Sequence, residues 1–293
     1  MLKKIKTGFI FILILGLLTA LVPSLVSAQK QKSYKLLIHG GDILEHYFEM
    51  HKSFGDYLSK ELGAPVEVLV SVDKQKTERL TQNKEIDFVY AGPWPSTFTI
   101  DFDYIAKAAL AQISTLEDIP KGYTRTVIVA RKDSGIKTLA DLKGKTVRFG
   151  GRLNFLINHL GKKLLKDAGI DINRDLADFF EGGYPGDALL SVYNGEFDAG
   201  VTLTVALTKN DVKVEDLIIL ASSFDIPGWG FAVRNDLDSQ TRENLKQALL
   251  KLDKSNLQHK QILDDMDMES FVEASNQEYD ITHGLKEMLK EFD

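Results

Sequence analysis

Hydrophobic and polar positions alternate with two different periods along the chain, most clearly over residues 122–151. Residues 124–130 are dense in β-branched side chains, which favours a buried strand. Thr138 then stands at an N-cap position, and Gly144 stands where a short helix would end. A second strand is predicted at 146–149. The stretch therefore reads as strand, turn, short helix and strand.

The same alternation continues over most of the chain. Strands are also predicted at 34–39, 66–72, 86–90, 178–181, 197–203, 217–221 and 230–234. Longer helices are predicted at 43–62, 74–82, 153–168 and 187–193, and helical, charged sequence is expected after 234. In the first of these helices the inward stripe is expected to be Ile43, Tyr47, Phe54 and Leu58. Strands that alternate with helices indicate an α/β fold with mostly parallel pairing.

The first 28 residues have the pattern of a secretory signal. A basic start is followed by an apolar run over residues 9–22, by Pro23, and by a Val-Ser-Ala ending at Ala28. This pattern predicts cleavage after Ala28 and export, and an uncleaved membrane anchor is the alternative. The chain has no cysteine, so the pattern of a lipid-anchored exported protein is absent and no disulfide framework is expected.

Charge and motifs exclude several functions. Removal of Lys3, Lys4 and Lys6 with the signal leaves 33 basic residues against 42 acidic ones, a net charge of −9. A nucleic acid is therefore not an expected partner. No catalytic motif is present, so no enzymatic activity and no cofactor is predicted. His39, His46 and His51 lie near one another, but the spacing of His46 and His51 does not place them on one helical face, and no metal site is predicted.

Four sequence strings resemble one protein family. These are VARKDSGIKTLADLKGKTVRFGG at 129–151, DFVYAGPWPSTF at 87–98, SVYNGEFDAGVT at 191–202 and IPGWGFAVRNDL at 226–237. They are similar to periplasmic phosphate/phosphite/phosphonate-binding (PhnD-like) solute-binding proteins, which have the type II periplasmic binding protein fold. The resemblance covers nearly the whole chain after the signal.

The resemblance implies two α/β lobes, each a mixed sheet flanked by helices, with the ligand cleft between them. The first lobe is expected at 29–122 plus 230–293, and the second at 123–229. The crossing strands near 124–130 and 230–234 are expected to act as a hinge.

Aromatic residues at predicted loop ends are the first ligand candidates. Trp94 lies between two prolines and Trp229 between two glycines, where the backbone can approach a ligand closely. Tyr90 and Tyr123 also lie near predicted loop ends. Packing in the core or between the lobes is the alternative role for each of these side chains.

The polar candidates follow from the family resemblance. It implies that Thr126 serves the ligand with its hydroxyl and that a hydroxyl-rich turn opens the helix after residue 149. Here that turn has no hydroxyls, but Arg152 and Asn154 offer side-chain donors beside a helix N-terminus. A second departure is Gly186, which stands where many relatives have a histidine. The ligand could therefore also be a small anion of another shape or a larger molecule bound through the aromatic residues.

The resemblance implies a periplasmic protein that captures a small ligand, expected to be an oxyanion, and delivers it to the membrane permease of an ABC transporter. It is expected to be a monomer. The alternative is a ligand-sensing module that docks on a membrane histidine kinase or a similar receptor.

Overall fold

A computed structural model describes residues 32–40, 44–93, 101–111, 118–151, 154, 156–208 and 212–280. For residues 44–46 it describes the backbone only. The predicted signal segment and the chain after 280 lie outside these ranges. Among the described helices none combines the length and the apolar character needed to span a membrane.

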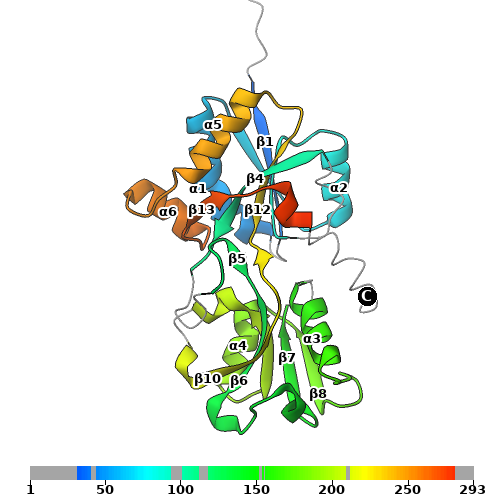
Figure 1. Cartoon of the computed structure of the whole chain (residues 1–293). Coiled ribbons are helices and arrows are strands. Elements are labelled where there is room, and N and C mark those ends of the chain that lie inside the picture. Colours follow the sequence, from blue (N-terminus) through cyan, green and yellow to red (C-terminus); the bar gives the residue numbers. More distant parts are fainter. Residues whose placement is uncertain are drawn as a thin grey trace, which may run out of the picture. The chain divides into compact units, whose positions relative to one another are not determined.

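The larger sheet has six strands in the order β13-β4-β12-β3-β1-β2 (Figure 1). Its strands are β1 (Tyr34–His39), β2 (Val66–Ser71), β3 (Phe88–Ala91), β4 (Phe102–Ala109), β12 (Gly230–Arg234) and β13 (Ser270–Glu273). β1 is parallel to both β2 and β3, whereas β12 is antiparallel to both β3 and β4, and β13 is antiparallel to β4. The sheet is therefore mixed, and two of its strands come from the far end of the sequence.

Helices with an apolar face or a capping residue in the sequence flank this sheet. Its helices are α1 (Leu44–Leu62), α2 (Lys74–Gln82), α5 (Ser239–Leu250) and α6 (Leu257–Asp265). Phe54 and Leu58 of α1 are fully buried against the sheet, as expected for one face of an amphipathic helix. Asp73 caps α2 and Asp238 caps α5 by accepting backbone N–H groups of the first turn.

A second sheet has five strands in the order β10-β6-β9-β7-β8. They are β6 (Thr126–Arg131), β7 (Thr146–Gly150), β8 (Asp178–Gly182), β9 (Ala199–Leu203) and β10 (Leu217–Ser222). β7 is parallel to β8 and β9, and β6 is antiparallel to β9 and β10. The helices α3 (Gly161–Asp167) and α4 (Pro185–Tyr193) pack on this sheet. Leu165 of α3 lies in one apolar cluster with residues of the strands, and Leu189 of α4 lies in another.

The chain passes between the two sheets twice, and the two crossing segments pair with each other. β5 (Tyr123–Thr124) and β11 (Ile226–Pro227) form a two-stranded antiparallel ladder. Next to it, the N–H of Gly228 donates to the carbonyl of Gly122 at 2.8 Å. β5 leads from β4 toward β6, and β11 leads from β10 to β12 (Figure 1).

The α/β fold with mixed sheets is confirmed, and the bounds predicted for β1, α2 and β12 agree with the structure to the residue. Other predictions were wrong. The strand predicted at 124–130 is interrupted at Arg125, and the helix predicted at 153–168 contains a π-helical turn at Leu156–Leu160 before α3 begins. The chain after 234 is not wholly helical, because it contains β13.

Two strands were not predicted because their partners are distant in sequence. β4 contains Asp103, Lys107 and three alanines, a composition that does not favour a strand. It nevertheless lies between β12 and β13, where residues 105–109 are all buried. β13 pairs with β4 across more than a hundred residues. Tertiary pairing therefore overrides local propensity in both strands.

The core of the six-stranded sheet predicts a clear contrast between two substitutions. Phe231 is fully buried among Phe54, Phe88 and Tyr90. We expect Phe231→Ala to lower the free energy of unfolding by about 3–5 kcal/mol, because the lost ring leaves a cavity. Leu257→Ala is the control, since Leu257 is 84% exposed and should change stability by less than about 0.5 kcal/mol. Urea titrations followed by circular dichroism measure both, and equal losses would contradict the assignment of Phe231 to the core.

Candidate ligand-binding site

Two parallel strands of the six-stranded sheet end side by side. His39 at the end of β1 is the register partner of Ala91 at the end of β3. Gly40 and Gly92 follow directly. In open α/β sheets, ligands bind beyond the carboxyl ends of the strands. This edge is therefore the first candidate for the binding surface.

Trp229 lies at the same edge. It precedes Gly230, whose register partner in β3 is Ala91. Its carbonyl accepts a hydrogen bond from the N–H of Ala108 at 2.8 Å. A Cβ atom on Gly40 would lie 2.3 Å from Cη2 of the Trp229 ring, and one on Gly92 would lie 3.3 Å from Nε1. Contact with the indole therefore requires glycine at position 40 and favours it at position 92.

Three further rings surround this indole. The ring of Tyr90 lies 5.2 Å from that of Trp229, and the ring of Tyr47 stacks on Trp229 at 6.1 Å with an interplanar angle of 12°. His51 stacks on Tyr47 at 6.2 Å. We call Tyr47, His51, Tyr90 and Trp229 the aromatic cluster. It provides a stiff apolar surface with a few polar edges, which is the usual lining of a small-molecule site.

Tyr90 belongs to the buried part of the aromatic cluster. It is 4% exposed, and its hydroxyl points to the sulfur of Met268 at 3.9 Å. Burial raises the pKa of Tyr90 well above its usual value. The phenol therefore stays protonated and neutral, and it carries no charge that would repel an anion.

The five-stranded sheet has a similar edge, rich in glycine. Gly150 of β7 and Gly182 of β8 are register partners. They are followed by Gly151 and Gly183, whose φ angles of 117° and 76° favour glycine. A Cβ on Gly150 would lie 2.8 Å from the backbone of Pro185 at the start of α4. The end of β7 therefore brings its backbone close to the start of α4.

Asn154 organises the turn after β7. Its Oδ1 accepts a hydrogen bond from the N–H of Ile157 at 3.2 Å, as an N-cap side chain does. Asn158 donates from Nδ2 to the carbonyl of Gly151 at 2.6 Å. At the neighbouring strand end, Asp187 accepts from the N–H of Tyr184, and the Tyr184 side chain is 47% exposed. Tyr184 is therefore an aromatic group available at this edge that the sequence did not single out.

The predicted ligand residues fall into three groups. Tyr90 and Trp229 lie together in the aromatic cluster. Thr126 is fully buried and donates its hydroxyl hydrogen to the carbonyl of Leu156 at 3.1 Å, two residues after Asn154. Trp94 and Arg152 lie outside the described residues. The ligand roles of all these residues stay predictions.

Tyr123 is engaged with residues that sequence reasoning missed. Its hydroxyl donates to Oε1 of Glu278 at 2.5 Å, and Nζ of Lys107 lies 4.7 Å from the centre of its ring. Lys107 also bonds to Glu278. Burial and the bond to Glu278 together raise the pKa of Tyr123 to about 12.

Some of the missed residues did carry a sequence signal. Tyr47 and His51 are four residues apart in a predicted helix, so they share a helical face. Gly40 follows a predicted strand, which is where a close approach to a ring is common. Glu278 belongs to a Ser-x-x-Glu pattern over 275–278 that is typical of a helix start. Lys107 carried no such signal, because it lies in β4, which was not predicted from the sequence.

Asp198, which matches the family, has a structural role. Its Oδ2 accepts hydrogen bonds from the N–H and the hydroxyl of Thr146, at 2.9 and 3.0 Å. It thereby links the start of β7 to the loop before β9. Among the described residues, no three His, Cys, Asp or Glu side chains come together in a group that could hold a metal ion.

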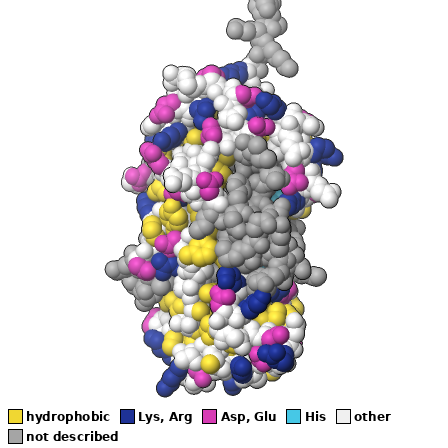
Figure 2. Space-filling view, turned by 45° about the vertical axis from the view of Figure 1, so that its right-hand side comes forward, with side chains coloured by type: hydrophobic (Ala, Val, Ile, Leu, Met, Phe, Trp, Pro, Cys, Tyr) yellow, Lys and Arg dark blue, Asp and Glu magenta, His cyan; other side chains and the backbone are white. Residues whose placement is uncertain are grey.

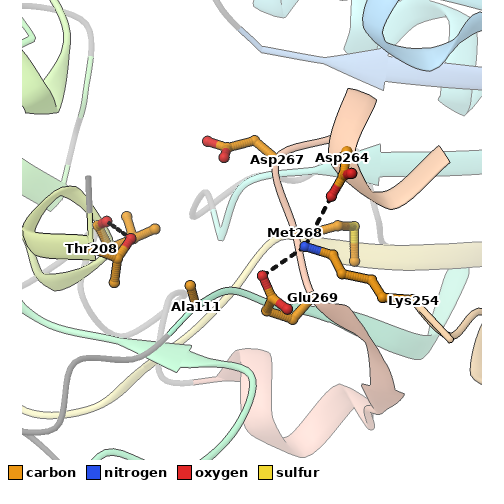
Figure 3. Close-up of a pocket in the computed structure, with 8 residues that line it drawn as sticks. Ala111, Thr208, Lys254, Asp264, Asp267, Met268 and Glu269 are labelled. Carbon is orange, nitrogen blue, oxygen red and sulfur yellow. Dashed lines mark hydrogen bonds and ion pairs between the residues drawn. The ribbon is translucent and has the colours of Figure 1, made fainter. Parts of the chain in front are cut away.

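The structure also contains a polar pocket of about 100 Å³. Its lining residues are Ala111, Val205, Thr208, Lys254, Asp264, Asp267, Met268 and Glu269. Figure 3 shows Lys254 between Asp264 and Glu269, at 3.2 and 2.7 Å. Lys254 is the only cation in this lining, and these carboxylates neutralise it. The pocket is therefore unsuited to an anion.

Charges of both signs are mixed on the face of the described residues that Figure 2 shows. On the face that Figure 2 shows, Lys and Arg side chains are interspersed with Asp and Glu. No extended basic surface is visible among the described residues on that face. An anion would therefore be recognised by local donors and not by a broad field.

The contact between Gly40 and Trp229 leads to a spectroscopic prediction. We expect Gly40→Ala to displace the indole, because the added Cβ would lie 2.3 Å from it. The tryptophan emission should shift, and stability should fall by about 1–3 kcal/mol. Gly186→Ala is the control, since a Cβ there meets no atom within 4 Å. An unchanged emission spectrum in Gly40→Ala, measured in a Trp94→Phe background, would contradict this placement of Trp229.

His39 predicts a dependence of stability on pH. Its Nδ1 lies 2.9 Å from Oγ1 of Thr77. Burial lowers the pKa of His39, Lys74 lowers it further by a smaller amount, and Asp73 and Glu78 oppose the shift. The folded chain thus binds this proton less readily than the unfolded chain, so stability should fall as the pH drops below about 6.5. His39→Gln should reduce that loss. Urea titrations from about pH 8 to about pH 5 measure the difference, and identical pH profiles would show that His39 contributes nothing.

Comparison with known proteins identifies the family of this chain. The family model for the periplasmic phosphonate substrate-binding protein of ABC transporters matches residues 45–279. The probable phosphite-binding protein PhnD1 of Prochlorococcus marinus is 26% identical over 259 residues, which cover 81% of this chain and 82% of that protein. A segment of 145 residues, 42% of this chain, is 32% identical to the tetrathionate sensor histidine kinase TtrS of Salmonella typhimurium, but it covers only 23% of that kinase.

Solved structures show the same fold. PhnD1 of Prochlorococcus marinus in complex with methylphosphonate matches with a TM-score of 0.65 at 20% identity, over 88% of this chain and 98% of that chain. The phosphonate-transporter binding protein PA3383 of Pseudomonas aeruginosa matches with a TM-score of 0.62 at 18% identity, over 90% and 88%. Since the family model spans most of the sequence, this chain belongs to the family of periplasmic substrate-binding proteins of phosphonate ABC transporters.

Proposed function

We propose that this protein captures a small oxyanion related to phosphate or phosphonate in the periplasm and delivers it to an ABC importer. Membership of the family supports the class of ligand and the class of partner. PhnD1 supports the choice further, because it is described as phosphite-binding and its structure holds methylphosphonate. We also propose that the chain acts without chemistry, as a monomer, after cleavage of its signal behind Ala28.

The observation that carries this proposal is the paired glycine ends of β7 and β8. Gly151 and Gly183 add no side chain of their own at these strand ends, and Asn154 caps the turn that follows β7. A helix start of this kind attracts an anion, because the helix dipole adds partial positive charge there. Arg152 in the same turn is proposed to supply the full positive charge that the missing hydroxyls cannot.

The aromatic cluster is proposed to form the opposite wall. Tyr90 and Trp229 from the six-stranded sheet, with Trp94 from the segment after β3, would cover the apolar part of the ligand. Tyr123 and Thr126 complete the proposed set from the first crossing segment and β6. In the described conformation both hydroxyls already have protein partners, so their contribution would require an exchange of hydrogen bonds on binding.

The lobe division at 122/123 and 229/230 is part of the same proposal. Each sheet then forms one lobe, and the β5–β11 ladder joins them. Rotation of one lobe about the crossing segments would close the walls over the ligand, as in other two-lobe binding proteins. The partial match to TtrS keeps a sensory role as the alternative, but transport is favoured because PhnD1 is matched over most of its length.

A ligand screen tests the class of solute. We expect phosphite, phosphate or a small phosphonate to raise the unfolding temperature of the mature chain, because binding to the folded state alone stabilises it. Sulfur oxyanions, including tetrathionate, are the contrasting set. Stabilisation by tetrathionate alone would reject phosphonate-class transport and favour the sensory role.

Arg152 should carry the charge contact. We expect Arg152→Ala to reduce the free energy of binding of the best anion by about 1.5–3 kcal/mol, the range of a hydrogen bond to a charged group. Arg174→Ala is the matched control, since Arg174 pairs with Asp175 in an exposed loop of the same sheet. Trp94→Ala should also weaken binding, with a smaller dependence on salt. Calorimetric titrations at low and high ionic strength measure these effects, and parental affinity in Arg152→Ala would remove this arginine from the site.

A further inference from the structure

Residues 275–280 are held together by Glu278. Its Oε2 accepts a hydrogen bond from the N–H of Ser275 at 2.7 Å, which is half of a capping box. Residues 276–280 are helical. Asn276 fastens this short segment to β4, because its Oδ1 accepts from the N–H of Tyr104 at 2.8 Å.

The other oxygen of Glu278 faces the first crossing segment. Oε1 accepts from the Tyr123 hydroxyl of β5 and also bonds to Nζ of Lys107 in β4. Lys107 is 4% exposed, so its charge depends on this partner. Burial raises the pKa of Glu278, but the hydrogen bonds from Lys107 and Tyr123 outweigh it, and the net shift is downward. Glu278 is therefore a permanent anion between β4 and β5.

The next residue faces the second crossing segment. Tyr279 is 2% exposed, and its ring stacks on Tyr104 at 3.7 Å with an angle of 7°. Its hydroxyl donates to the carbonyl of Gly228 at 2.8 Å. Gly228 lies between the β11 strand and Trp229, so this bond fixes the backbone from which the Trp229 ring extends.

Beyond these contacts, the two crossing segments are weakly joined. The β5–β11 ladder has only two residue pairs, and one of them contains Pro227, which has no N–H to donate. Arg125 then links the segments electrostatically, with Asp118 at 2.8 Å and Asp225 at 2.5 Å. The N–H of Ser223 also donates to the carbonyl of Thr126 at 2.8 Å, and Oγ of Ser223 accepts from the N–H of Thr126 at 3.0 Å. Among the described residues, the short ladder, the Arg125 ion pairs and these two bonds are all that this stretch adds against bending.

We propose that residues 275–280 form a hinge anchor that holds both crossing segments and the backbone of Trp229 against β4, so that bending is confined to residues 124–126 and 222–227. Glu278 binds the first crossing segment through Tyr123, and Tyr279 binds the second through the carbonyl of Gly228. Tyr279 is thereby a positioning residue for Trp229. This inference rests on the proposed function, because the motion that the hinge anchor guides is the closure of the two lobes over the ligand.

The test compares two buried tyrosines that each donate to a backbone carbonyl. Tyr279→Phe removes the bond to Gly228, and Tyr57→Phe removes the bond of Tyr57 to Ala248 at 2.7 Å, far from the crossing segments. Both variants should lose similar stability. In the whole chain without ligand, NMR-detected hydrogen exchange at the amides of Gly228 and Ala108 should be roughly fivefold faster in Tyr279→Phe alone, which corresponds to one hydrogen bond.

A second variant and a spectrum complete the design. Glu278→Gln keeps the size of the side chain and removes its charge, so it should also speed exchange at Ala108, beside Lys107. In a Trp94→Phe background, the emission of Trp229 should shift in Tyr279→Phe and stay unchanged in Tyr57→Phe. Equal exchange and equal emission in the two tyrosine variants would overturn the anchor.

The ligand arm separates this inference from the proposed function. Inorganic phosphate, phosphite and methylphosphonate are titrated into the parent and both tyrosine variants. A selective loss of affinity in Tyr279→Phe, at least threefold, supports the anchor, because Gly228 and Trp229 would no longer be held in the closing geometry. Failure of the parent to bind any of these anions contradicts the proposed function alone, and the exchange measurement then decides the anchor by itself.

Discussion

The architecture depends on the return of β12 into the middle of the six-stranded sheet. This strand pairs with β3 on one side and with β4 on the other, so its ladder joins the first part of the chain to a segment more than a hundred residues later. Antiparallel register places its first residue, Gly230, beside Ala91 and Lys107. The position of Trp229, the course of the second crossing segment and the contacts of Tyr279 all follow from that register.

The same register explains why glycine is concentrated at the strand ends. A tryptophan ring at this edge needs space that only Gly40 and Gly92 leave, and a Cβ on Gly230 would collide with Tyr104 and Tyr279. At the other sheet, Gly150 and Gly183 make room for the start of α4 and for Asp187. Glycine thus serves close packing at both edges, against an aromatic ring at one and against a helix start at the other.

Local patterns predicted the parts of the fold that depend on neighbours in sequence. The capped short helix after Thr138, the helix α2 and the strands β1 and β12 are examples, because their signals are caps and alternation over a few residues. β4 and β13 could not be predicted in this way, since their stability comes from pairing with each other and, for β4, with β12. The interruption at Arg125 was hidden for a similar reason, because its partners Asp118 and Asp225 are set by the crossing geometry.

For the proposed site, the sequence pointed to residues at strand ends but not to the neighbours that each of them has in the structure. Trp229 between two glycines was a readable signal, whereas the burial of Thr126 against Leu156 and the bond of Tyr123 to Glu278 depend on tertiary structure.

The strands of the larger sheet come from two separate parts of the chain, and this sets the order in which the two sheets can be completed during synthesis. All strands of the five-stranded sheet are present once residue 222 has been synthesised, but the larger sheet cannot be complete until residue 273 has emerged. The sheet that begins first in the sequence is therefore the last that can be completed, and until residue 234 has emerged β3 and β4 lack the strand that joins them.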